Sequence, residues 1–366
     1  MSNTVTPHSK AILVTYHDPF AKQEAIGLAE SAGFEVTQIV VQRYLKHGEF
    51  GVGSGKAEEI KQIAETSGCK DIIVDEGLTS SQIYNLSKLT GKNIIDREKL
   101  ILDIFASRAT TTEAKLQVQL AELGYEMPRA RQNVRLSVKG EQQGLSGIGE
   151  YAVDVRFRAL KKQMVSIKAK LREAEKRRNL YRSQRQKLNT PLVSLVGYTS
   201  SGKTTLFNRM TDEDKEVASS LFTTLGTTTR TMSLPDSTKI LLSDTVGFIS
   251  RLPTYMIEAF KSTLEELNYA DIVLLVVDAS EPPYDVSIKY NTCLTTLEGL
   301  KVASSRVITV LNKSDIASKT NMNEVKDIVG DATQTIISAK RGDGIHVLKN
   351  LIMQNTKLAP EAAIPK

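Results

Sequence analysis

The chain has 366 residues, of which 40% are hydrophobic and 25% are charged, and its formal net charge is +6. This composition is typical of a globular protein with two or three domains, and it excludes disordered and fibrous chains. No apolar run approaches the roughly 18 residues that a membrane span needs, and the polar N-terminus shows no secretory signal, so we expect a cytoplasmic protein. The two cysteines, Cys69 and Cys293, are too isolated in sequence to predict a disulfide framework or a zinc site.

Strand and helix patterns alternate through the first part of the chain. Strands are predicted at 11–16, 36–41, 71–75 and 93–96, and helices at 20–32, 55–66, 80–89 and 97–108. Strands that alternate with helices of this length indicate a parallel sheet with crossover helices. We therefore predict an N-terminal α/β domain with a parallel sheet over residues 1–110.

The apolar period then becomes helical, which predicts a helical-hairpin arm over residues 111–189. Leu116, Leu120 and Leu123 recur at helical spacing on the first helix of the arm. A stripe on the second helix, made of Leu160, Met164, Ile167 and Leu171, is expected to pack on the helix that contains Leu116 and Leu120. The glycine-rich segment Gly140–Gly149 is predicted to be the loop between the two helices. Residues 156–187 carry thirteen Lys and Arg against two Glu, so the positive charge of the chain is concentrated on this arm.

Strand and helix patterns alternate again from residue 190, which predicts a C-terminal doubly wound α/β domain over 190–357. Its strands are expected at 192–196, 240–242, 272–277, 307–311 and 335–337. The remaining residues, 358–366, are rich in Ala and Pro and are expected to form a frayed tail.

A P-loop motif follows the first strand of this last domain. Gly197-Tyr-Thr-Ser-Ser-Gly-Lys-Thr204 fits GxxxxGK[ST] and precedes a helical run, which is the structural context that the motif requires. The backbone N–H groups of such a loop surround phosphate oxygens, its lysine contacts the β- and γ-phosphates, and its hydroxyl binds Mg²⁺. The predicted phosphate-binding residues are Gly197, Tyr198, Thr199, Ser200, Ser201, Gly202, Lys203, Thr204, Thr205 and, from a later strand end, Gly247.

Three further motifs follow strand ends in the order expected of a GTP-binding domain. Asp244-Thr-Val-Gly247 can organise Mg²⁺ and offer an N–H to a γ-phosphate. In Asn312-Lys313-Ser314-Asp315, the carboxylate of Asp315 can accept both N1–H and N2–H of guanine, a pair that adenine does not present. Ser338-Ala339-Lys340 can supply a backbone N–H to guanine O6. These motifs predict guanine rather than adenine specificity.

The chain resembles the HflX family, within the TRAFAC class of translational GTPases, over essentially its whole length. The resemblance is carried by Gly51–Lys56, Leu100–Ala106, Lys115–Ala121, Gly197–Thr199, Phe222–Leu225, Asp244–Ile249, Leu252-Pro253 and Glu258–Glu266. It implies a GTPase that converts GTP and water to GDP and phosphate with Mg²⁺ as cofactor. It also implies binding to the large ribosomal subunit, and some members of the family split stalled or hibernating ribosomes.

The resemblance also assigns the two switch segments. Switch I is Phe222, Thr223, Thr224, Leu225 and Gly226, and switch II is Asp244, Thr245, Val246, Gly247 and Phe248. The implied Mg²⁺ ligands are Thr204, Thr224 and, through water, Asp244, with Thr228 as the alternative to Thr224.

Three positions leave part of the expected chemistry open. Ser200 replaces an Asn that helps to hold a monovalent cation in related GTPases, so potassium stimulation is left open. Phe248 stands where many GTPases have a water-orienting Gln, and it predicts slow intrinsic hydrolysis. Gly51–Lys56 lacks the first glycine of a P-loop, because Phe50 occupies that position, so a structural turn is favoured over a second nucleotide site.

Two classes of function remain after these motifs. The first is GTP hydrolysis coupled to ribosome binding, in ribosome splitting, rescue or quality control. The second is a nucleotide-gated switch that binds RNA or ribosomes and hydrolyses GTP incidentally. In both, the basic arm and the loop Gly140–Gly149 are the predicted contacts with ribosomal RNA, because Lys and Arg neutralise phosphates. The sequence leaves the oligomeric state open.

Overall fold

The computed structural model describes residues 9–140, 146–187, 190–213, 221–222 and 228–358. Its contacts divide the chain into two compact units, which we describe separately. The first comprises Met1–Arg172 with Pro253–Ala259, and the second comprises Glu173–Leu252 with Phe260–Lys366. Of the predicted tail, residues 359–366 lie outside the described residues. Within the described ranges, no helix is both long and apolar enough to cross a membrane.

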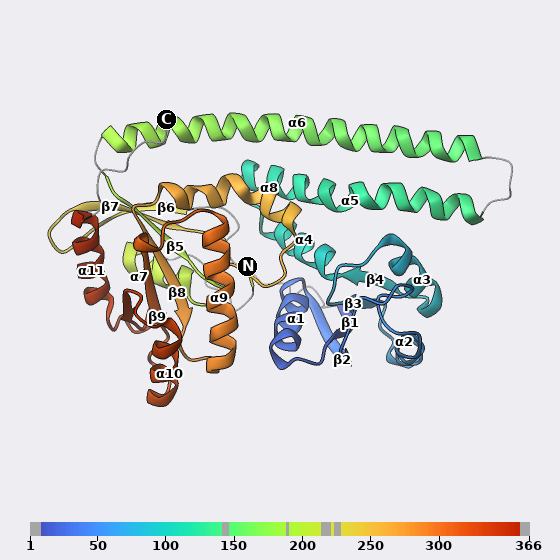
Figure 1. Ribbon diagram of the computed structural model, residues 1–366, viewed down its shortest axis with the longest axis horizontal. Helices are drawn as coiled ribbons and strands as arrows, with labels where there is room; N and C mark the ends of the chain where they lie inside the picture. The colour runs from blue at the N-terminus through green and yellow to red at the C-terminus, as the bar shows by residue number, and fades with distance from the viewer. Residues whose placement is uncertain (1–8, 141–145, 188–189, 214–220, 223–227, 359–366) are drawn as a thin grey trace, which may run out of the picture. The chain divides into compact units, whose positions relative to one another are not determined.

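The first unit begins with a four-stranded sheet in the order β2-β1-β3-β4, in which every pair of neighbours is parallel. Its strands are β1 (Ser9–Tyr16), β2 (Phe34–Gln42), β3 (Asp71–Val74) and β4 (Asn93–Asp96), and its helices are α1 (Pro19–Ser31), α2 (Ser54–Ser67), α3 (Ser80–Thr90) and α4 (Arg97–Arg108). The parallel α/β sheet predicted from the sequence is therefore confirmed. The helices α1 and α4 contact each other, as do α2 and α3, so two helices cover each face of the sheet (Figure 1).

Alternate residues of the central strands make the core of this unit. Ile12, Val14, Ile72 and Val74 are fully buried and cluster with Ile60 and Leu86 from α2 and α3. Polar side chains start the helices at the ends of the strands: Asp18 accepts a hydrogen bond from the N–H of Ala21, and Thr79 forms a capping box with Gln82.

The segment Gly51–Lys56 forms a tight turn into α2. Gly51 has φ +75°, and a Cβ atom there would lie 2.4 Å from Leu78 Cδ2. Its backbone pairs with that of His47, and Lys56 is ion-paired with Glu59 one turn along the same helix. All of these contacts are made with residues of the same unit, and they account for the segment as a structural turn.

The arm contains helices α5 (Thr112–Gly140) and α6 (Ser146–Lys187), which run side by side (Figure 1). The loop expected at Gly140–Gly149 is shorter than predicted, because α6 already begins at Ser146 and residues 141–145 lie outside the described part. Adding a residue to an existing helix gains a hydrogen bond without a new nucleation cost, which allows α6 to extend through Gly147 and Gly149. The apolar stripe of α6 packs on Leu123, Met127 and Ala130 of α5 through Leu160, Met164 and Ile167. The stripe therefore packs on the predicted helix, through Leu123 of the predicted pattern, whereas Leu116 and Leu120 are absent from this cluster.

An ion pair fixes the first helix of the arm to the α/β sheet. Arg129 of α5 donates from Nη2 to Asp96 Oδ2 at 2.7 Å and to the carbonyl of Leu78 at 2.6 Å. Asp96 is fully buried at the end of β4, where it also accepts from the N–H of Lys99 and from the Tyr125 hydroxyl. Burial raises the pKa of Asp96, against the opposing effect of Arg129.

The second unit is built on a six-stranded sheet in the order β10-β9-β8-β5-β7-β6. Its strands are β5 (Leu192–Val196), β6 (Thr228–Ser233), β7 (Lys239–Asp244), β8 (Ile272–Asp278), β9 (Val307–Asn312) and β10 (Gln334–Ile336). Its helices are α7 (Lys203–Thr211), α9 (Pro283–Gly299), α10 (Lys319–Val329) and α11 (Ile345–Leu358), with two 3₁₀ turns at Glu265–Tyr269 and Ser304–Arg306. Helix α8 (Thr254–Leu264) belongs partly to each unit by its contacts.

The predicted doubly wound arrangement of this unit is confirmed, with one added strand. Leu206 and Phe207 of α7 and Leu348 and Ile352 of α11 share a core cluster with the central strands. Helix α9 contacts β8 and α10 and buries Cys293 and Leu297 apart from that cluster. The added strand is β6, which pairs antiparallel with β7 at the sheet edge. It was missed because its sequence, Thr-Thr-Arg-Thr-Met-Ser, is polar and mostly exposed.

Candidate functional site: a P-loop nucleotide site

The strand register brings the four sequence motifs to one edge of the sheet. Strand β5 ends just before Gly197, β7 and β9 end at Asp244 and Asn312, and β10 ends at Ile336, two residues before Ser338. Because these four strands are parallel, the residues that follow them meet at the same carboxyl edge. In open α/β sheets, ligands bind at this edge.

The P-loop has the backbone shape of a phosphate cradle. Gly197 has φ +146° and Gly202 has φ +92°, and Ser200 is one of the non-glycine residues with positive φ, at +62°. A Cβ atom at Gly202 would lie 2.3 Å from Asn312 Nδ2, so only glycine fits there. Helix α7 begins at Lys203, and the N–H groups of its first turn therefore face the loop.

Lys203 occupies the centre of the loop. Its ammonium group donates to the carbonyl oxygens of Gly197 at 3.0 Å and Tyr198 at 2.7 Å. Burial lowers the pKa of Lys203 to about 8, and the carboxylate of Asp244 opposes this shift. The side chain is thus held in position for the β- and γ-phosphates, whose charge would stabilise its protonated form.

The predicted metal-binding side chains of the P-loop and switch II lie together. The hydroxyl of Thr204 donates to Asp244 Oδ2 at 3.3 Å, and Asp244 is fully buried. A hydroxyl and a carboxylate are the hard oxygen ligands that Mg²⁺ prefers.

Switch II is joined to the P-loop by backbone hydrogen bonds. The N–H of Phe248 donates to the carbonyl of Gly197 at 3.0 Å, and the N–H of Thr199 donates to the carbonyl of Phe248 at 2.9 Å. Phe248 is buried, as a packing role under switch II requires. Gly247 lies directly against the P-loop, since a Cβ atom there would be 3.0 Å from Thr199 Cγ2 and 3.1 Å from Lys203 Nζ.

The two guanine motifs are joined to each other and to the P-loop. Asn312 donates from Nδ2 to the carbonyl of Ser201 at 2.9 Å and accepts from the N–H of Ala339 at 3.0 Å. The Ser338 hydroxyl donates to Asp315 Oδ1 at 2.7 Å, and this hydrogen bond lowers the pKa of Asp315. Asp315 is therefore held as a carboxylate, the form that accepts from two N–H groups of a base.

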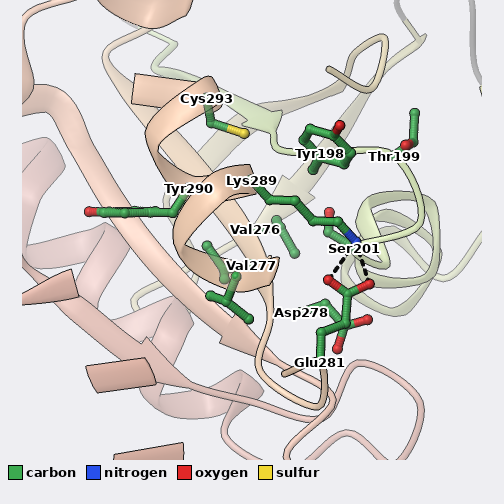
Figure 2. Close-up of a pocket in the computed structure, with 11 residues that line it drawn as sticks. Tyr198, Thr199, Ser201, Val276, Val277, Asp278, Glu281, Lys289, Tyr290 and Cys293 are labelled. Atoms are coloured by element: carbon green, nitrogen blue, oxygen red, sulfur yellow. Dashed lines mark hydrogen bonds and ion pairs between the residues drawn. The ribbon is translucent and has the colours of Figure 1, made fainter. Parts of the chain in front are cut away.

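A pocket lies behind the P-loop, between β8 and α9 (Figure 2). The side chains of Tyr198, Lys289 and Cys293 point into it, and Lys289 forms an ion pair with both carboxylate oxygens of Glu281 at 2.5 Å. Burial raises the pKa of the Cys293 thiol to about 12, so this cysteine is a neutral packing residue.

Comparison with known proteins identifies the family. Three family profiles match in succession: GTP-binding GTPase N-terminal at residues 21–106, GTP-binding GTPase Middle Region at 108–185, and 50S ribosome-binding GTPase at 192–313. The GTPase HflX of Caldanaerobacter subterraneus subsp. tengcongensis is 40% identical over 346 residues, covering 93% of this chain and 78% of the relative. The chain belongs to the HflX family. The GTPase HflX of Escherichia coli is 38% identical over 88% of this chain and 76% of its own length.

Two crystal structures share the fold of this HflX-family protein. A GTP-binding protein from Sulfolobus solfataricus, solved with GDP, aligns at a TM-score of 0.51 and 24% identity over 96% of this chain and 100% of the other. A complex of SsGBP with GDP aligns at 0.54 and 26% identity over the same shares. Membership of the HflX family makes the protein a GTPase, which converts GTP and water to GDP and phosphate.

The structure describes most of the predicted site of this HflX-family GTPase. The switch I residues Thr223, Thr224, Leu225 and Gly226 lie outside the described residues, whereas Phe222 is buried with φ +58° and Thr228 begins β6. Sequence analysis missed the ion pair of Lys313 Nζ with Asp278 Oδ2 at 2.5 Å, which fixes the guanine motif to the end of β8. Asp278 follows an apolar strand, as the residues of the four motifs do, and this position could have indicated in the sequence that Asp278 belongs to the site.

Proposed function

We propose that this protein is a Mg²⁺-dependent cytoplasmic GTPase that associates with the large ribosomal subunit and acts in ribosome splitting, rescue or quality control. The observation that carries the ribosome role is the exposed basic face of α6. Lys161, Lys162, Lys168, Arg172 and Arg177 are exposed, while Leu160 on the same helix is buried against α5. Cations that are not used in packing remain available to the phosphates of RNA.

Arg178 differs from these residues, although the sequence placed it in the same group. Its side chain is only 17% exposed, and its Nε lies 3.6 Å from Glu266 Oε1. We therefore assign Arg178 to the fold of the protein and leave it out of the proposed RNA contact.

The hydrolytic site supports direct attack of water on the γ-phosphate. Lys203 would stabilise negative charge on the β- and γ-phosphates, and the N–H of Gly247 would donate to a γ-phosphate oxygen. The oxygens of Thr204 and Asp244 fit Mg²⁺, which when bound neutralises charge on the phosphates. Thr224, or Thr228 in its place, is the proposed switch I ligand. Phe248 offers no hydrogen bond to water, so we propose a slow intrinsic rate that a ribosomal partner increases.

The guanine base is proposed to bind between Asn312–Asp315 and Ser338–Lys340. The support is the geometry of Asp315, whose carboxylate is fixed by Ser338 and has Arg341 Nε at 4.0 Å. The N–H of Ala339 is engaged by Asn312 in the described structure, so a base that binds there has to share or displace that bond.

Co-sedimentation with ribosomal subunits tests the partner. Wild-type protein is expected to pellet with the large subunit in GTP or a non-hydrolysable analogue, and less in GDP. A variant with Lys161→Glu, Lys162→Glu and Lys168→Glu should bind weakly, and its binding should depend less steeply on salt by about two to three in the log–log slope.

The matched control reverses three exposed lysines in residues 9–108, Lys10, Lys70 and Lys88, for the same change in net charge. It should retain binding, and circular dichroism should show both variants folded, because exposed cations contribute little to stability. Wild-type affinity and slope in the α6 variant would refute the arm as the ribosomal contact.

The alternative function is a nucleotide-gated RNA-binding switch with incidental turnover, and the same basic face supports it. Multiple-turnover GTP hydrolysis with and without large subunits separates the two. A rate that rises with subunits supports coupled hydrolysis, and an unchanged rate with nucleotide-dependent binding supports the switch.

A further inference from the structure

We infer that the side chain of Tyr198 is a positioning residue for GTP hydrolysis, which holds switch II against the P-loop through its hydroxyl group. Position two of a GxxxxGK[ST] motif is variable, so the motif itself assigns no role to this side chain. The inference rests on four sets of contacts, all within the second unit.

The hydroxyl group of Tyr198 is bonded to the segment that directly follows switch II. It accepts a hydrogen bond from the N–H of Ser250 at 2.8 Å. Two residues earlier, Phe248 makes its two backbone bonds with Gly197 and Thr199, on either side of Tyr198. Residues 248–250, at the end of switch II and just beyond it, are therefore held to residues 197–199 by three hydrogen bonds, and the Tyr198 hydroxyl accepts the last of them along the chain.

These bonds determine where Gly247 lies. Gly247 immediately precedes Phe248, and it approaches Lys203 so closely that an added Cβ would be 3.1 Å from the ammonium nitrogen. In the proposed hydrolytic site, on which this inference rests, Lys203 and Gly247 are the two groups that meet the γ-phosphate together. Because stabilisation of developing charge depends on donors that are already in place, a bond that restrains this segment contributes to the rate of the chemical step.

The ring of Tyr198 is itself fixed from behind. It is 4% exposed, and the ammonium group of Lys289 lies 5.3 Å from its centroid, within the range of a cation–π contact. Glu281 holds that ammonium group by two hydrogen bonds (Figure 2). Lys289 of α9 thus restrains the ring from one side, and this contact helps to keep the Tyr198 hydroxyl group directed toward Ser250.

The competing explanation is that Tyr198 only fills space beneath the P-loop. The substitution Tyr198→Phe separates the two, because it keeps the ring and removes the oxygen atom that accepts from Ser250. The matched control is Tyr290→Phe. Tyr290 lines the same pocket and is similarly buried, at 6%, but its hydroxyl points away from Tyr198 (Figure 2).

The experiment measures the single-turnover rate of GTP hydrolysis at saturating protein, together with GDP affinity. Loss of one neutral hydrogen bond that acts in the transition state predicts a rate lower by about 2- to 10-fold for Tyr198→Phe. GDP affinity should stay within about twofold, because the phosphate-binding backbone is unchanged. Tyr290→Phe should match wild type in both.

Hydrogen exchange at the Ser250 amide gives a readout that a space-filling role would not change. This amide should exchange faster in Tyr198→Phe than in wild type and Tyr290→Phe. An unchanged hydrolysis rate would overturn the inference, even with faster exchange. A parallel loss of GDP affinity and rate would overturn it as well, since it would show a role in the fold of the P-loop instead.

Discussion

Replacement of Gly197 by alanine tests whether the function of the P-loop depends on its close approach to strand β8. A Cβ atom at this position would lie 2.3 Å from the carbonyl oxygen of Val276 and 3.1 Å from Ser201 Oγ. Val276 belongs to β8 and is paired with Val310 of β9, so its carbonyl cannot retreat without disturbing the sheet. The φ of +146° adds strain for any residue with a side chain.

The magnitude follows from these two costs. A residue forced into a glycine-only conformation costs about 1–3 kcal/mol, which should appear as a lower free energy of unfolding. To relieve the clash, the P-loop has to move outward by about 1 Å, and a displacement of that size costs about 100-fold in a reaction that depends on position. We therefore expect Gly197→Ala to lower kcat/KM for GTP about 100-fold.

Fluorescent GDP titration, GTPase kinetics and thermal unfolding measure these effects. Gly299→Ala is the control, because Gly299 is the exposed last residue of α9 and a Cβ there would meet nothing within 4 Å. It should leave kinetics unchanged and stability unchanged or slightly increased. Wild-type affinity and kinetics in Gly197→Ala would show that the loop does not need its close approach to Val276.

One further substitution and one change of pH test the nucleotide site. Asp315→Asn should weaken GTP binding by one to two decades, since a charge-assisted hydrogen bond is worth about 1.5–3 kcal/mol, and should improve binding of xanthosine triphosphate. A GTP affinity equal to that of wild type would contradict the assignment of Asp315 to the guanine base. Because burial lowers the pKa of Lys203 to about 8, the nucleotide-free protein loses this positive charge as pH rises through that value. GDP affinity should therefore fall about fourfold between pH 7 and 8.5, and calorimetry that shows no fall would contradict the shift.

The sequence predicted those parts of the fold that depend on local pattern. Runs such as Leu192–Val196 and Ile272–Asp278 are apolar because both faces of the strand are covered, and such runs are recognisable without a structure. The edge strand β6 has no such pattern, since it depends on hydrogen bonds to β7. The packing register of the arm, with Leu160 on Leu123 and Ala130, depends on how two helices align and is not encoded in the spacing of either one.

In the candidate site, too, the sequence predicted the local motifs but not the contacts between them. The P-loop and guanine motifs are contiguous in sequence, and their residues were predicted individually. The contacts between motifs join residues far apart in the chain, such as Asn312 with Ser201 and Tyr198 with Ser250. Such pairs arise from the strand order, in which β5 lies between β7 and β8, and one sequence without its structure does not reveal them.

The bond between Arg129 and Asp96 has a consequence for dividing this protein into fragments. A cut after residue 110 separates α4 from α5 and exposes Ala114, Val118 and Ala121, all buried in the intact chain. It also leaves the buried carboxylate of Asp96 without its guanidinium, and breaking a buried ion pair costs about 3–5 kcal/mol. A fragment that ends near Arg172 keeps both partners and the contacts between α5 and α6. The base of the arm is therefore a poor boundary at which to end an isolated N-terminal fragment, although it lies between two helices.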